Sequence, residues 1–124
     1  KNIRRENVSY LDLAECFLET DPEVAGFLAG KEMESLIYAL YEQVIPRHKG
    51  YRARDFRSRL EELWEKRHLR DQEKEEIIGW WETRNKAVHP DWVSVSPEEV
   101  ALFREEVIRM ISGVRKFKEK LSKS

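Results

Sequence analysis

The segment from residue 96 to residue 121 constrains the fold more than any other part of the sequence. Its apolar side chains recur every three or four positions, the period that places them on one face of an α-helix. Ser96, Pro97 and Glu99 stand in the order of a capped helix start. This face consists of Val100, Phe103, Val107, Met110, Ile111, Val114, Phe117 and Leu121. The pattern predicts one long helix that must bury this face against the rest of the chain.

Proline and glycine divide the remainder into four further segments, all with helical rather than alternating periodicity. Ser9 is placed to cap a first short helix, in which Leu11, Ala14, Phe17 and Leu18 share a face. Asp21 and Pro22 form the start of a second helix, which is expected to run to about residue 45 and stop before a proline. Its apolar stripe is Ala29, Met33, Leu36, Ile37, Leu40 and Val44.

A third helix is predicted around Phe56, and a fourth is predicted to be capped by Asp71. The fourth should end near Val88, because Pro90 disfavours the helical conformation at the residue before it. No segment is a better strand candidate than residues 92–95. We therefore predict an all-α domain over residues 1–124: an antiparallel bundle of about five helices in which short connections make sequential helices neighbours.

Composition limits the classes of partner and compartment. With 124 residues the chain is long enough for one core, and its net charge of −1 provides no global attraction to nucleic acid or anionic lipid. Cys16 is the sole cysteine, which excludes an internal disulfide and a cysteine-rich zinc site, and we expect it to be buried. No apolar run approaches the roughly 18 residues of a membrane span. We expect a reduced, cytoplasmic setting without a membrane partner. The start at Lys1 is consistent with excision from a longer protein.

The fourth predicted helix contains an arginine where an apolar residue is expected. Arg84 falls in the middle of the face formed by Ile77, Trp80, Trp81 and Val88. An unpaired buried guanidinium costs several kcal/mol. Three interpretations remain open. The arginine pairs with a carboxylate of a neighbouring helix, or its stem packs on Trp80 while its head reaches solvent, or this face meets a partner or an anionic ligand.

The sequence around Arg84 resembles the signature of the HEPN family of all-helical domains. That signature is an arginine, a polar residue that is often asparagine, several further residues and then a histidine, near the end of the helix before the last one. Here it is R-N-K-A-V-H, from Arg84 through Asn85 to His89. One toxin branch of the family carries a tyrosine two residues after the histidine, where this chain has Asp91. Regulation by modification of that tyrosine is therefore not expected.

The resemblance implies a metal-independent endoribonuclease, and a toxin or defence effector, whose cleft is shared by the two protomers of a homodimer. Arg84, Asn85 and His89 would be the catalytic residues, with no cofactor and no metal ligand. The partners would be RNA and a nucleotidyltransferase-type antitoxin. The alternatives are a non-catalytic helical dimerisation or interaction domain, in which the motif is structural, and a nucleotide-binding partner of a separate nucleotidyltransferase.

A nearly neutral protein needs a local basic patch to hold RNA. Residues 47–59 provide the best candidate, with Tyr51 and Phe56 interleaved as stacking groups. The alternative is that this stretch is a solvated loop and helix start. The residues expected to contact RNA are Arg47, Lys49, Arg52, Arg54 and Arg57.

Overall fold

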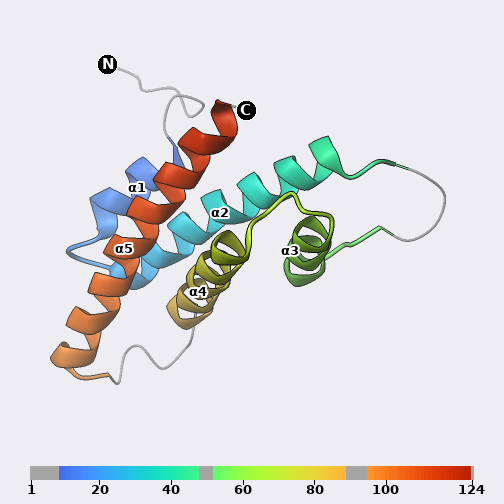
Figure 1. The fold of residues 1–124 in the computed structure, drawn as a ribbon. Coiled ribbons are helices and arrows are strands. Elements are labelled where there is room, and N and C mark those ends of the chain that lie inside the picture. Colours follow the sequence, from blue (N-terminus) through green and yellow to red (C-terminus); the bar gives the residue numbers. More distant parts are fainter. Residues whose placement is uncertain (1–8, 48–51, 89–94, 124) are drawn as a thin grey trace, which may run out of the picture.

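The computed structural model describes residues 9–47, 52–88 and 95–123, and in these ranges every regular element is a helix. The helices are α1 (Tyr10–Phe17), α2 (Pro22–Val44), α3 (Phe56–Glu65), α4 (Asp71–Ala87) and α5 (Pro97–Ser122) (Figure 1). The predicted all-α class and the five helices are thereby confirmed. Residues 92–94 of the strand candidate lie outside the described residues, and Val95 is not part of a strand.

Helix α2 is the central element, because it packs against each of the other four helices. In Figure 1, α1 and α5 lie beside one part of α2, and α3 lies near the C-terminal end of α2. Helix α4 lies between α5 and α3. Each helix also contacts the next one in sequence, as the short connections predicted. The arrangement brings α2, α3 and α4 together on one side of the molecule, where Arg84 and the described residues of the basic segment 47–59 both lie.

The predicted apolar faces form the core. In α2, Ala29, Met33 and Ile37 are fully buried, whereas the other members of the stripe are partly buried. In α5 the buried residues are Phe103, Val107, Met110, Ile111, Val114 and Phe117. The interior is therefore made by the two long helices, with the shorter ones covering their apolar faces.

Three of the four predicted N-cap positions are correct. Ser9 Oγ accepts a hydrogen bond from Asp12 N (3.1 Å), and Ser96 Oγ accepts one from Glu99 N (3.2 Å). Asp21 is the N-cap of α2 but forms no side-chain cap bond. The prediction for α4 was wrong by one residue, because Arg70 is the N-cap and Asp71 opens the helix. The Asp71 carboxylate instead accepts a hydrogen bond from the indole of Trp64 (2.7 Å), which ties α4 to α3.

The prediction that Cys16 is buried is also wrong. Leu11 and Ala14 turn to the core, and Cys16 lies two residues after Ala14, which is about 200° further round the helix. Its thiol is consequently exposed. In the described part of the chain, no helix has the length and apolar character needed to cross a membrane.

Trp80 determines how closely α4 approaches α5. Its ring packs edge-on to Phe117, with centroids 6.3 Å apart, and lies directly over Gly113. A Cβ atom at Gly113 would lie 2.5 Å from Trp80 Cζ2, a distance that a rigid ring cannot accommodate without moving. The glycine in the middle of α5 is therefore required by packing.

We expect Gly113→Ala to lower the free energy of unfolding by about 1–3 kcal/mol, because the added methyl group overpacks the α4–α5 contact. Gly79→Ala is the matched control, since a Cβ at that exposed helical position would meet no atom within 4 Å beyond the backbone of its own helix. That control should gain up to about 1 kcal/mol from helix propensity. Urea denaturation followed by circular dichroism measures both, and equal stabilisation of the two variants would contradict the packing described.

Candidate functional site

Arg84 lies in the last turn of α4, where its side chain crosses α2 at Gly30. A Cβ atom at Gly30 would lie 2.3 Å from Arg84 Cγ and 2.9 Å from Arg84 Cβ. Any larger residue at this position would displace the stem of the arginine or separate the two helices. The absence of a side chain at Gly30 therefore determines where the stem of Arg84 lies.

The guanidinium of Arg84 is held mainly by aromatic packing. Its Cζ lies 5.0 Å from the centroid of Trp81 and 5.8 Å from that of Phe27. Its Nε lies 3.8 Å from a carboxylate oxygen of Glu34 on α2, and the side chain is 23% exposed. The first interpretation of Arg84 holds, because it pairs with a carboxylate of a neighbouring helix. The second is wrong as stated, because the guanidinium rather than the stem lies over an indole, and that indole is Trp81 rather than Trp80.

These contacts leave most of the hydrogen-bonding capacity of Arg84 unused. A guanidinium has five N–H donors. Nη1 donates to Oδ1 of the exposed Asn85 (3.3 Å), whereas the buried Nε has no hydrogen-bond partner among the described residues. The separation from Glu34 is an ion-pair distance and too long for a hydrogen bond. Arg84 is therefore positioned by packing, and its remaining donors are on the Nη atoms because Nε is buried. His89 lies outside the described residues.

The apolar face of α4 is mostly covered within the chain. Ile77 and Ala87 are buried, and Trp80 packs against α5. Trp81 stacks on Phe56 of α3, with centroids 4.3 Å apart and rings inclined by 15°. Val88, 49% exposed, is the member of the predicted face that remains at the surface. The two tryptophans are thus used for helix packing, and a partner surface on α4 would be confined to its C-terminal end.

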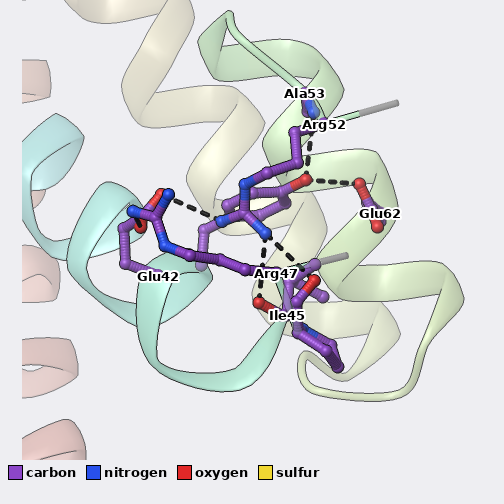
Figure 2. A network of polar contacts seen from close by, with 8 residues as sticks. Glu42, Ile45, Arg47, Arg52, Ala53 and Glu62 are labelled. Atoms are coloured by element: carbon purple, nitrogen blue, oxygen red, sulfur yellow. Dashed lines mark hydrogen bonds and ion pairs between the residues drawn. The ribbon is translucent and has the colours of Figure 1, made fainter. Parts of the chain in front are cut away.

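The basic segment is attached to the end of α2 by Arg52, as Figure 2 shows. Its Nη1 donates to the carbonyl oxygens of Ile45 (3.2 Å) and Pro46 (3.1 Å), and its Nη2 donates to Glu42 (3.0 Å). Carbonyls at a helix C-terminus carry partial negative charge, which a cation stabilises. Arg47 pairs with the same glutamate. The pKa of Glu42 is lowered, first by the hydrogen bond from Arg52 and further by the charges of both arginines.

Tyr41 makes the second attachment and is fully buried. Its hydroxyl donates to Glu62 of α3 (2.6 Å) and accepts from the backbone N–H of Ala53 (3.0 Å) (Figure 2). Burial and the hydrogen bond to Glu62 raise the pKa of this phenol, although the Ala53 amide lowers it. One side chain of α2 thereby fixes both the segment that leads into α3 and α3 itself.

The five expected RNA contacts have different environments. Arg54 and Arg57 are exposed, whereas the guanidinium of Arg52 is occupied by partners within the chain. Arg47 is exposed and paired with a carboxylate, and Lys49 lies outside the described residues. The expected stacking role of Phe56 is wrong, because its ring is buried against Trp81. Tyr51, the other expected stacking group, lies outside the described residues.

A pocket of about 500 Å³ lies beside the neighbours of Arg84, although Arg84 itself is not among the residues that line it. The pocket is lined by Arg57 and Arg59 of α3 and by Arg54, which lies just before this helix. Glu34 and Trp81, which both contact Arg84, also line it. The fold thus brings the surroundings of the motif arginine and the basic segment to one pocket between α2, α3 and α4. Groups of three or more His, Cys, Asp or Glu side chains arranged for a metal ion do not occur in the described ranges.

Sequence reasoning missed Tyr38, which lines the same pocket from α2. The Cζ atom of Arg59 lies 4.8 Å from the centroid of the Tyr38 ring. The available signal was that Tyr38 directly follows Ile37 of the core stripe, so that it points about 100° away from the buried face. An aromatic residue outside the apolar stripe of an amphipathic helix is a candidate for a surface contact.

We expect Tyr41→Phe to lower the free energy of unfolding by about 1–3 kcal/mol, because a buried amide and a carboxylate lose their partner. The raised pKa also gives a pH dependence. The native state favours the protonated phenol, so this contribution is complete below the ordinary value of 10.0 and is lost as pH rises through the native pKa. Denaturation at pH 8 and about pH 11 should show a smaller alkaline loss for the variant. An equal loss would contradict the assignment.

Comparisons of the chain with models of protein families, with curated proteins and with solved structures found no match.

Proposed function

We propose that this chain is a metal-independent endoribonuclease of the HEPN type. The observation that carries the proposal is the state of Arg84: its stem packs over Gly30, its guanidinium lies over Phe27 and Trp81, and its Nη atoms make one hydrogen bond, to Asn85, among the described residues. A fixed cation with free N–H groups is suited to phosphate oxygens. The exposed Asn85 adjoins it, and its neighbours Trp81 and Glu34 line the pocket that is also lined by arginines.

The proposed chemistry uses the 2′-hydroxyl of RNA as the nucleophile. A base removes its proton, the oxygen attacks the adjacent phosphorus, and an acid protonates the departing 5′-oxygen. The products are a 2′,3′-cyclic phosphate and a 5′-hydroxyl end. His89 is assigned the proton transfers, since an imidazole titrates near ~6.5. Arg84 stabilises the charge on the phosphorane oxygens, and Asn85 orients either the imidazole or the phosphate.

A homodimer would supply one such motif from each protomer, and two histidines would then divide the acid and base roles. Val88, the C-cap residue of α4, and Tyr38 of α2 are exposed apolar residues of the elements that carry the site. An interface at the C-terminal end of α4 would cover Val88 without disturbing either tryptophan.

The ion pair of Arg84 with Glu34 and its packing on Trp81 favour a second candidate function. In that case Arg84 stabilises the α2–α4 contact, and the chain is a non-catalytic helical interaction domain. A nucleotidyltransferase-type antitoxin as partner and a cytoplasmic location belong to the first proposal and follow from the resemblance in the motif.

The decisive prediction concerns cleavage of labelled RNA in EDTA. His89→Ala and Arg84→Gln should each abolish cleavage, because the first removes the proton-transfer group and the second removes the charge. Arg84→Gln retains the Cβ and Cγ that pack over Gly30, and Glu34 is 31% exposed, so the loss of stability should stay below about 1 kcal/mol. Arg109→Gln, an exposed change on α5, is the control. Cyclic-phosphate ends that persist in both motif variants would refute the catalytic assignment.

The second prediction concerns oligomeric state. Sedimentation velocity should show a dimer at a protein concentration of tens of micromolar, which is roughly the range expected for a stable interface. Val88→Glu should shift the equilibrium to monomer, because a symmetric interface brings the new charge close to its copy. Leu102→Glu, at a 66% exposed position of α5, is the control and should leave the dimer intact. A wild-type chain that sediments as a monomer over this range would contradict a shared active site.

A further inference from the structure

Tyr38 and Arg59 form a stacked pair at the pocket between α2, α3 and α4. The phenol ring is 48% exposed, and the guanidinium carbon of Arg59 lies 4.8 Å from its centroid. Arg59 forms no ion pair within 4.0 Å in the described part of the chain, and its Nε is buried without a hydrogen-bond partner. The two buried side-chain polar atoms without a partner in the described ranges are this Nε and that of Arg84.

The carboxylates of the pocket are already engaged. Asp55 accepts the N-cap hydrogen bond from Ser58 N (2.8 Å), and its pKa is lowered first by that bond and last by the charge of Arg59. Glu34 pairs with Arg84. Arg54 and Arg57 are exposed, and within the described ranges neither forms an ion pair shorter than 4.0 Å. The pocket combines a flat aromatic and cationic surface with two cations on its rim.

We propose that this pocket binds one unpaired nucleotide of single-stranded RNA, with its base stacked on the Tyr38–Arg59 pair and its flanking phosphates on Arg54 and Arg57. The identity of the ligand rests on the proposed ribonuclease function. Unpaired bases stack on aromatic rings and on arginine planes, and phosphates bind exposed arginines. A pocket of about 500 Å³ is within the range of small-ligand sites and accommodates one nucleotide.

The structure separates Tyr38 from the other three tyrosines of the chain. Tyr41 is fully buried, and Tyr10 is 40% exposed on α1, which does not line the pocket. Tyr51 lies outside the described residues. Phe56, the other aromatic residue of the basic segment, is buried under Trp81. Tyr38 is therefore the aromatic side chain that combines wide exposure with a position beside the arginines.

The test measures binding separately from cleavage. The first probe is fluorescein-labelled octauridine with every 2′-oxygen methylated, so that no internal nucleophile remains. The second is an abasic octamer with the same sugar–phosphate backbone and label. Fluorescence anisotropy in EDTA gives the dissociation constant of each probe for the full chain, and thermal unfolding confirms that each variant is folded.

Tyr38→Ser should weaken octauridine binding about tenfold and abasic binding by less than about twofold, because it removes stacking and leaves the charges. Tyr38→Phe should restore octauridine binding, and Tyr10→Ser should change neither constant. Arg57→Gln should weaken both probes and flatten the salt dependence. A purely structural role for Tyr38 would instead affect the two probes equally.

An unchanged octauridine affinity in Tyr38→Ser, or an equal loss for both probes, would overturn the proposed base platform. Equal affinity of the wild-type chain for the two probes would also overturn the base platform, and the pocket would then be a binding site for phosphates only. The outcome is independent of catalysis. If His89→Ala still cleaves RNA but Tyr38→Ser shows the selective loss, the catalytic assignment fails while the nucleotide pocket stands.

Discussion

The close approach of α4 and α5 to α2 is the constraint on which the rest of the structure depends. A Cβ at Gly26 would lie 3.1 Å from Ala87 and 3.2 Å from Phe103, and one at Gly30 would overlap the stem of Arg84. Small residues on this face of α2 let three helices meet, and the large residues of the other helices fill the resulting space. Arg84 reaches its position because the crossing point contains no side chain.

The charge of the site depends on which arginines are paired within the chain and which remain exposed. The guanidinium of Arg52 donates hydrogen bonds to backbone carbonyls just after α2 and to Glu42, so it fixes the path of the basic segment. Arg54 and Arg57, further along the same segment, remain exposed at the pocket. A chain with a net charge of −1 thus gathers positive charge locally. Such a local field suits a single nucleotide better than the long tract of phosphates that a basic surface would attract.

The fold and the site differ in how far the sequence predicts them. Helical periodicity and the pairs Ser96–Pro97 and Asp21–Pro22 located the helices, because caps and apolar stripes are local properties. The cap of α4 was misassigned because Asp71 has a suitable side chain but bonds to Trp64 of another helix. Phe56 was misread for the same kind of reason, since its partner Trp81 is far away in sequence.

The sequence by itself determined the all-α class, the five helices, the core stripes of α2 and α5 and the candidate motif that begins at Arg84. Each depends on residues within a few positions of one another. Tertiary structure alone decided that Arg84 packs on Trp81 and Phe27, that Arg52 faces inward, and that Tyr38 meets Arg59. These outcomes depend on how closely helices distant in sequence approach, which is set by packing between them and not by the periodicity of either one.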